Sequence, residues 1–340
     1  MTANAARIKG FDGLRAIAIL LVFFSHKLDI SQAPGRAGVW LFFVLSGFLI
    51  VRILARSRAR IEVGQQDAPA ALIDFFRRRT ARIFPIYYLV LAIASLVGLF
   101  VTIEAFAPGR AIYFWLYGVN FLQAGLGDWI PEFGHFWSLA VEEQFYLLAA
   151  PLLLLLPQRY ALPACCTLIA IGLAAKARLH AAGASDITLY VDALSNFALL
   201  AYGGTIGLLA DRPLPARLCS GAAQAGVLSA YIGIVTFVAD PLLGELAVLL
   251  VGVLLVQLYQ NQRSWFVGAL DSAPFRPIGR ISYGLYVLHP FVVLPMIDNG
   301  VLRLCAEFGG TLGLAALSFR YFESPIMRWA TAQRIPKHAA

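Results

Sequence analysis

Two ionisable residues, Arg15 and His26, lie in the first long apolar stretch of the sequence, GLRAIAILLVFFSH, with ten residues between them. A guanidinium and an imidazole are costly inside a membrane-length segment, and such residues usually mark a functional site. On an α-helix, eleven steps of about 100° return His26 to within about 20° of Arg15, roughly 16 Å further along the same face. One helix face therefore offers a cation near one membrane surface and a titratable base deeper in. This arrangement suits a substrate with a charged head and a distant reactive end.

The composition is that of a polytopic membrane protein. Of 340 residues, 60% are hydrophobic and 14% are charged, whereas a soluble domain carries about 25% charged residues. The first apolar run is long, holds Arg15 and His26 and lacks a small-residue cleavage site, so we expect a retained helix rather than a cleaved signal. The net charge of +8 lies beside apolar runs, so no nucleic-acid partner is expected. The cysteines lie in apolar runs without metal-ligand spacing, which predicts buried thiols and no metal site.

Eleven apolar segments divide the chain, and all but 111–124 are long enough to cross a bilayer. We therefore predict an all-α polytopic membrane protein with about ten transmembrane helices plus one short re-entrant or interfacial segment. Residues 1–325 are expected to form a single membrane domain, 326–340 a short cytoplasmic tail, and 56–76 the only sizeable polar loop. The eleven segments are 11–29, 37–55, 83–103, 111–124, 137–157, 160–179, 189–210, 219–238, 242–260, 278–297 and 304–323.

The positions of the basic residues predict the orientation of these helices. With ten crossings both termini share one side, and the loops on that side carry most of the lysines and arginines. Positive charge marks cytoplasmic loops, so we expect both termini in the cytoplasm and His26 in the outer half of its helix. If 111–124 also crossed, five later arginines would face outward against this rule, namely Arg212, Arg217, Arg263, Arg276 and Arg280.

Consecutive carboxylates inside an apolar segment also need an explanation. Glu142 and Glu143 point about 100° apart on a helix, so one face cannot hide both from lipid. At least one must find a partner or a wet cavity, or be protonated. Asp12 has a simpler interpretation, because it can cap the first helix and pair with Arg15 at i, i+3.

Other polar residues suit a structural role as well as a functional one. Arg320 and Glu323 are expected to form an i, i+3 ion pair. His135 falls in a polar loop and is expected to be solvated, whereas His289, before Pro290, suits either role equally. Residues with an ordinary place at the membrane interface are Arg79, Arg82, Trp137, Tyr283 and Tyr286.

Taken in order, six stretches of the sequence resemble the acyltransferase-3 family of integral membrane O-acyltransferases. They are FDGLRAIAILLVFFSH, GVWLFFVLSGFLI, RTAR with RIFPIYY, FWSLAVEEQFY, ISYGLYVLHP and RYFESP, and they cover residues 11–325. The resemblance implies a ten-helix bundle in the bacterial cytoplasmic (inner) membrane. It also implies transfer of an acyl group, often acetyl, from acyl-CoA to a hydroxyl of a sugar, cell-surface glycan, glycolipid or secondary metabolite. Trp40 stands where many relatives have an acidic residue, which affects an accessory polar contact rather than the chemistry.

The resemblance also implies roles for individual residues. His26 is the expected catalytic residue, and Arg15 completes the pair. A nearby carboxylate, Glu142 or Glu143, is expected to orient the imidazole and stabilise its charged form. No permanently bound cofactor is expected, since acyl-CoA is a co-substrate.

The arginines before the third apolar segment are the expected donor site. Arg79 and Arg82 match the family's Arg-x-x-Arg motif, and the adjacent Arg77 and Arg78 are suited to the phosphates of coenzyme A. Residues expected to support the substrate or the structure are Asp12, Ser46, Trp137, Ser138, Tyr283, His289 and Glu323.

Two questions stay open at the level of sequence. His26 can act as a general base on the acceptor hydroxyl or can itself carry the acyl group. A proton-coupled transporter would use the same buried histidine, glutamate and arginine residues, although it would need no arginine-rich phosphate site. A non-catalytic membrane scaffold is a further alternative, in which His26 would matter only for stability.

Overall fold

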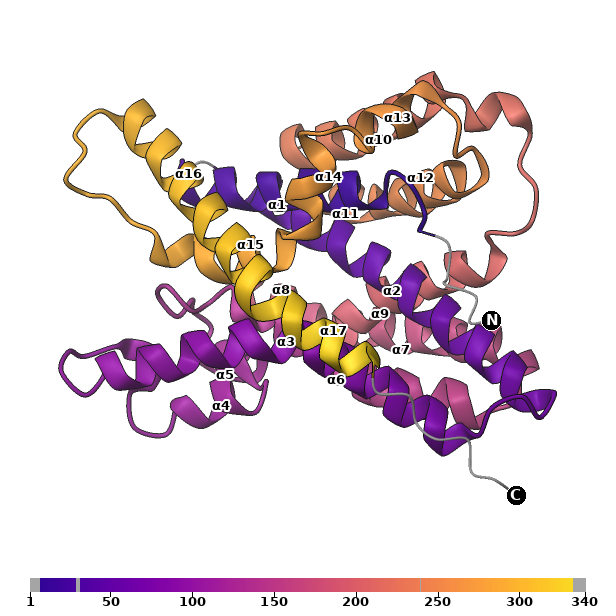
Figure 1. The fold of residues 1–340 in the computed structure, drawn as a ribbon, viewed down its shortest axis with the longest axis horizontal. Helices are drawn as coiled ribbons and strands as arrows, with labels where there is room; N and C mark the ends of the chain where they lie inside the picture. Colours follow the sequence, from indigo (N-terminus) through magenta and orange to yellow (C-terminus); the bar gives the residue numbers. More distant parts are fainter. Residues whose placement is uncertain (1–6, 29–30, 239, 333–340) are drawn as a thin grey trace.

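The computed structural model describes residues 7–28, 31–238 and 240–332, and every regular element in these ranges is helical (Figure 1). The longer helices are α1 (Phe11–Lys27), α2 (Ala33–Glu62), α3 (Ala68–Val97), α6 (Phe136–Leu155), α7 (Ala161–Ala181), α9 (Ala193–Leu209), α10 (Gly221–Phe237), α12 (Val248–Gln260) and α16 (Gly300–Ser318). The shorter helices are α4 (Ala111–Trp115), α5 (Val119–Leu126), α8 (Asp186–Val191), α11 (Pro241–Leu246), α13 (Trp265–Leu270), α14 (Phe275–Arg280), α15 (Ser282–Leu288) and α17 (Ser324–Ala332). Single turns are η1 (Glu104–Phe106), η2 (Gln158–Tyr160), η3 (Ala216–Cys219), η4 (His289–Phe291) and the π-helical η5 (Phe319–Glu323).

Within the described residues, 6 helical stretches are long and apolar enough to cross a membrane. Helices α1, α9 and α10 have 17 residues each, a rise of about 26 Å per helix, which is slightly less than the usual hydrocarbon thickness. The all-helical membrane class is therefore confirmed, and the count of about ten crossings stays a prediction. The 6 stretches are Ala33–Glu62, Ala68–Val97, Phe136–Leu155, Gln158–Ala181, Leu242–Gln260 and Gly300–Ala332.

Helix α2 occupies the centre of the bundle. It packs against α1, α9, α6 and α10, while α17 packs against α3 and α16 packs against α15 (Figure 1). Its approach to α9 is so close that a Cβ on Gly47 would lie 1.8 Å from the carbonyl oxygen of Leu200, and one on Gly203 would lie 2.0 Å from that of Val44. Small residues allow such close backbone packing, which holds membrane helices together where hydrophobic burial adds little.

The predicted polar loop over 56–76 is wrong. Helices α2 and α3 continue through most of it and leave only residues 63–67 between them. Ion pairs at helical spacing support both extensions: Arg58 pairs with Glu62 at 3.1 Å, and Asp74 pairs with the two arginines that follow it at i+3 and i+4. The charged residues therefore sit on helix ends rather than in a loop.

Two apolar segments of the sequence are broken in the structure. Segment 111–124 forms the short helices α4 and α5, which confirms that it is not a single spanning helix. Segment 278–297, expected as one helix, is instead divided into α14, α15 and η4, and its crossing of the membrane stays a prediction. Helix α15 ends at Leu288 and passes into the turn η4, because Pro290 has no N–H to donate to the carbonyl oxygen of Tyr286.

The end of the last helix also differs from the prediction. Glu323 accepts a hydrogen bond from Ser318 at 2.7 Å, and the described residues contain no ion pair between it and Arg320. The π-helical turn η5 changes the angular step along the helix, so the i, i+3 relation on which the predicted pair depended is lost. Of the expected tail at 326–340, residues 333–340 lie outside the described residues. The four cysteines are free; Cys165 and Cys219 are buried as predicted, whereas Cys166 and Cys305 are exposed on the bundle.

Candidate active site

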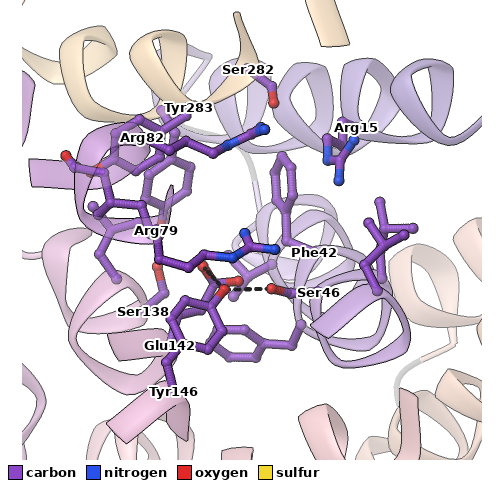
Figure 2. Close-up of a pocket in the computed structure, with 17 residues that line it drawn as sticks. Arg15, Phe42, Ser46, Arg79, Arg82, Ser138, Glu142, Tyr146, Ser282 and Tyr283 are labelled. Carbon is purple, nitrogen blue, oxygen red and sulfur yellow. Dashed lines mark hydrogen bonds between the residues drawn. The ribbon is translucent and has the colours of Figure 1, made fainter. Parts of the chain in front are cut away.

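An inner cavity lies between α1, α2, α3, α6 and α15 (Figure 2). Three guanidinium groups enter it, from Arg15 on α1 and from Arg79 and Arg82 on α3, and Figure 2 shows them directed toward the same space. Glu142 supplies the only carboxylate among its described lining residues. The cavity therefore carries a positive excess and suits an anionic ligand.

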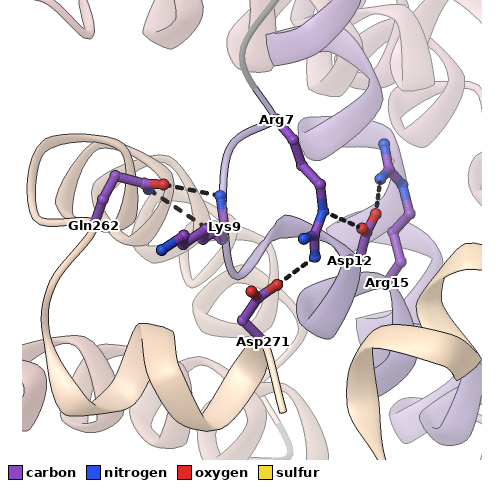
Figure 3. A network of polar contacts seen from close by, with 6 residues as sticks. All are labelled: Arg7, Lys9, Asp12, Arg15, Gln262 and Asp271. Atoms are coloured by element: carbon purple, nitrogen blue, oxygen red, sulfur yellow. Dashed lines mark hydrogen bonds and ion pairs between the residues drawn. The ribbon is translucent and has the colours of Figure 1, made fainter. Parts of the chain in front are cut away.

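Arg15 is held in place from the start of α1. Its guanidinium donates to Asp12 at 3.0 Å, which confirms the predicted i, i+3 pair. The predicted capping role of Asp12 is wrong, because Gly10 is the N-cap residue of α1 and no side chain caps the helix there. The other oxygen of Asp12 accepts from Arg7 at 3.0 Å, and Arg7 also pairs with Asp271 after α13 (Figure 3). The Asp12 carboxylate thus links the Arg15 guanidinium, through Arg7, to Asp271.

The carboxylate of the inner cavity ends a short hydrogen-bonded chain. The Tyr146 hydroxyl donates to Glu142 Oε2 at 3.2 Å, and it lies 2.6 Å from Ser46 Oγ. Because a tyrosine has a single hydroxyl hydrogen, Ser46 is then the donor to Tyr146. The ring of Tyr146 also lies 5.5 Å from the guanidinium of Arg79, in a cation–π contact. Ser46, expected as a supporting residue, therefore lies in the inner cavity.

Glu143 is separated from its neighbour. Its side chain is buried, it lines neither the inner cavity nor the outer one described below, and its Oε1 has no hydrogen-bond partner among the described residues. The geometric argument that one helix face cannot serve both carboxylates is confirmed, since Glu142 alone reaches the cavity.

The four arginines of the predicted donor site do not all line the inner cavity. Arg79 and Arg82 line the inner cavity, but Arg77 and Arg78 do not. Both of the latter pair with Asp74, at 2.5 and 2.8 Å. The sequence motif therefore separates into cavity residues and residues that stabilise the helix outside it.

A second cavity, the outer cavity, contains His26. His26 is exposed to it, and two further histidines, His135 and His289, also line it. His135 is only 7% exposed and its Nε2 lies 3.4 Å from the carbonyl oxygen of Val287, so the prediction of a solvated loop histidine is wrong. Helix α15 covers His135, and the sequence of the loop alone does not indicate this contact.

His26 binds a histidine and not a carboxylate. Its Nδ1 lies 2.8 Å from Nε2 of His289, and the two ring planes differ by 20°. The expectation that Glu142 or Glu143 orients His26 is therefore wrong, because Glu142 belongs to the inner cavity and Glu143 to neither. His289 is the partner, placed there by η4 from 263 positions away in the sequence.

The aromatic residues expected at the membrane interface lie inside the bundle. Trp137 is 2% exposed and Tyr286 is 6% exposed. The Tyr286 hydroxyl donates to the carbonyl oxygen of His135 at 3.0 Å and lies 2.6 Å from Ser138 Oγ. Tyr283 donates to the carbonyl oxygen of Ile83 at 2.9 Å and lines the inner cavity. These side chains shape the cavities rather than anchor the protein in lipid headgroups.

The outer cavity is lined by aromatic rings and by side chains that can form hydrogen bonds. Trp129 and Tyr190 offer aromatic surface, and the carboxylates of Glu132 and Asp186 can accept hydrogen bonds. Arg36 lies between the rings of Trp40 and Tyr190, at 5.9 and 5.3 Å.

The two cavities meet at two residues. Val39 of α2 and Tyr286 of α15 line both of them. Helix α1 carries Arg15 into the inner cavity and His26 into the outer one.

Comparisons with known proteins identify relatives of this chain. A family model described as an acyltransferase domain, acyltransferase 3, matches residues 8–318. The peptidoglycan O-acetyltransferase OatA of Listeria monocytogenes is 29% identical over 355 residues, covering 94% of this chain and 56% of that protein. YrhL of Bacillus subtilis is 28% identical over 364 residues, covering 96% and 56%. The O-acetyltransferase OatA of Staphylococcus aureus is 30% identical over 150 residues, covering 42% and 24%.

The chain thus spans about half the length of the curated relatives it matches over nearly its whole extent. No solved structure matches it.

Proposed function

This chain belongs to the acyltransferase-3 family of membrane O-acyltransferases, and from that premise we propose that it moves an acetyl group from acetyl-CoA to a hydroxyl of a cell-surface glycan. The protein would lie in the bacterial cytoplasmic membrane with both termini in the cytoplasm. The inner cavity would then receive the donor from the cytoplasm, and the outer cavity would receive the acceptor.

The charge of the inner cavity supports a coenzyme A donor. Three guanidinium groups converge there, and guanidinium forms short, charge-assisted and often bidentate hydrogen bonds with phosphate. Arg79 and Arg82 would hold the phosphates, while Arg15 lies at the start of the helix that leads to His26. The pantetheine arm would run along this helix toward the outer cavity.

The lining of the outer cavity supports a glycan acceptor. Its aromatic rings can stack on the apolar faces of sugars, and its carboxylates can accept hydrogen bonds from hydroxyls. The Listeria relative is named for peptidoglycan O-acetylation, so peptidoglycan or a similar glycan is the first acceptor to test.

The reaction itself would need one base at the meeting point of the two ligands. His26 would take the proton of the acceptor hydroxyl, and the hydroxyl oxygen would attack the thioester carbonyl carbon. The new C–O bond forms, the C–S bond breaks, and the imidazolium returns its proton to the departing thiolate. The products are the acetyl ester and free coenzyme A.

The junction of the cavities at Val39 and Tyr286 is the observation that carries this proposal, because a donor and an acceptor on opposite sides can meet there. The test uses purified protein in lipid nanodiscs with acetyl-CoA and a peptidoglycan glycan fragment. Free thiol and acetyl ester are measured for wild type, for His26→Ala and for His180→Ala, which changes an exposed histidine of α7.

We expect acceptor-dependent release of thiol that His26→Ala abolishes and His180→Ala preserves. Turnover that survives His26→Ala, or well-folded wild type that is inactive across several acyl-CoA lengths and glycans, would overturn the proposal. A stable acetyl adduct on His26 would replace direct transfer by a two-step route.

A further inference from the structure

The hydrogen bonds of His289 determine which of its nitrogens carries hydrogen. Its Nδ1 lies 2.8 Å from the backbone carbonyl oxygen of Tyr286, and its Nε2 lies 2.8 Å from Nδ1 of His26. A carbonyl oxygen can only accept, so the hydrogen must be on Nδ1 of His289. In a neutral imidazole the other nitrogen is then an acceptor, and His26 must donate to it.

The surroundings of His289 favour the neutral ring. The side chain is fully buried, and the described residues hold no ion pair between it and a carboxylate. The ionisable groups that act on it are two other imidazoles, His135 and His26, and the ammonium of Lys27. Protonation of His289 would add a second positive charge beside that of Lys27. That charge would be buried without a carboxylate partner, which is strongly unfavourable.

His26 therefore carries its hydrogen on Nδ1, where it donates to His289, and keeps a lone pair on Nε2. His26 is the exposed member of the pair, and it lines the outer cavity. Of its two nitrogens, only Nδ1 has a hydrogen-bond partner among the described residues. The free lone pair is thus the one available to a ligand in that cavity.

A buried ion pair fixes the segment that carries His289. Lys27, adjacent to His26, lies 3.1 Å from Glu307 of α16, and their side chains are 10% and 7% exposed. Lys27 also donates to the carbonyl oxygen of Val292 at 2.6 Å, and Glu307 accepts from the backbone of Leu294 at 2.9 Å. These contacts hold the chain after Pro290 against the end of α1. They therefore constrain the distance between the rings of His26 and His289.

We propose that His289 is a positioning residue that holds His26 in the tautomer with an unprotonated Nε2. This inference deepens the proposed function and rests on His26 being the base. When Nε2 takes the proton of the acceptor hydroxyl, the Nδ1 hydrogen stays bonded to His289, which spreads the new positive charge. A neutral imidazole here does what a carboxylate does for the histidine of a serine hydrolase, without leaving a buried anion.

The kinetic test compares two substitutions of His289. His289→Gln keeps an acceptor oxygen near the position of Nε2, whereas His289→Leu removes it. We expect His289→Leu to lower kcat about 100-fold or more, as loss of the correct tautomer does elsewhere, with KM for acetyl-CoA unchanged. His289→Gln should recover most of kcat, and His180→Gln should match wild type.

Equal losses in His289→Gln and His289→Leu would overturn the inference, as would a loss that appears only in KM. These outcomes are read against His26→Ala. If His26→Ala is active, the proposed function fails first. If His26→Ala is inactive and His289→Leu is fully active, only the present inference fails.

A spectroscopic test reads the tautomer in the wild-type protein and needs no variant of His289. Nitrogen-15 spectra of wild-type protein with labelled histidine, in nanodiscs, report which ring nitrogen carries hydrogen, and His26→Gln assigns the signal. We expect a neutral His26 with hydrogen on Nδ1 and a bare Nε2. A His26 with hydrogen on Nε2 would contradict the inference, whatever the kinetics show.

Discussion

Arg15 and His26 lie on one face of α1 and line different cavities, Arg15 the inner and His26 the outer. The helix separates them by roughly 16 Å along its axis. A ligand that reached both would have to pass Val39 and Tyr286, the two residues shared by the cavities. The spacing of Arg15 and His26 along α1 would thus match the distance between the charged end of a donor and its reacting end.

One substitution should block passage between the two cavities. Val39→Trp fills the junction with a large side chain, and we expect it to reduce acetyl transfer by about 100-fold or more because reactants must be within about 3.5 Å to react. Binding of coenzyme A, measured by calorimetry, should change less than about threefold, since the arginines are untouched. Ile53→Trp, at an exposed position of the same helix, should remain active. Full activity in Val39→Trp would exclude passage at this point.

Neighbouring arginines of α3 offer a matched pair for the donor site. Arg79→Ala removes a guanidinium from the inner cavity, and we expect KM for acetyl-CoA to rise about tenfold to a hundredfold, as for loss of a charge-assisted hydrogen bond. Arg78→Ala removes one that pairs with Asp74 outside the cavity, and KM should change less than about twofold. Equal effects of the two substitutions would show that the inner cavity does not select the donor.

The ion pair between Lys27 and Glu307, beside His26, should support the stability of the fold. Lys27→Met leaves Glu307 buried without its partner, and we expect a cost of about 3 kcal/mol or more in unfolding free energy. The double change Lys27→Met with Glu307→Leu should cost less than the sum of the single changes. Thermal unfolding in detergent micelles, followed by circular dichroism, tests this cycle. Strict additivity would mean that the two side chains do not interact.

Packing of the central helix predicts a contrast between two glycines. In Gly47→Ala the new Cβ would lie 1.8 Å from the carbonyl oxygen of Leu200, so α2 and α9 must move apart, and we expect a loss of about 3 kcal/mol. Gly226→Ala in α10 meets nothing within 4 Å and should stabilise slightly or have no effect. The two unfolding midpoints should therefore shift in different directions or by clearly different amounts; a tolerated Gly47→Ala would contradict the close packing.

Local spacing accounts for what the sequence could predict. The Asp12–Arg15 pair follows from helical i, i+3 geometry, and the different fates of Glu142 and Glu143 follow from the angular step between consecutive residues. The failure of 111–124 to form one long helix follows from its length. Each of these depends on one element alone.

The partner of His26 could not be found by such reasoning. His289 is 263 positions away, and no periodicity relates the two residues. The burial of His135 likewise depends on α15, a helix from the far end of the chain. The ISYGLYVLHP stretch carried the only signal, a histidine at the end of an apolar segment, and it did not distinguish a structural role from a functional one.

The central claim is that the acyl group passes from the inner cavity to the outer one. The most direct measurement uses proteoliposomes in which the protein has one known orientation, with radiolabelled acetyl-CoA supplied to one face and a glycan acceptor to the other. We predict labelled glycan only when acetyl-CoA is on the face that opens to Arg79 and Arg82 and the glycan is on the face that opens to His26. Equal labelling with donor and acceptor exchanged, or labelling only when both are on the same face, would contradict the account.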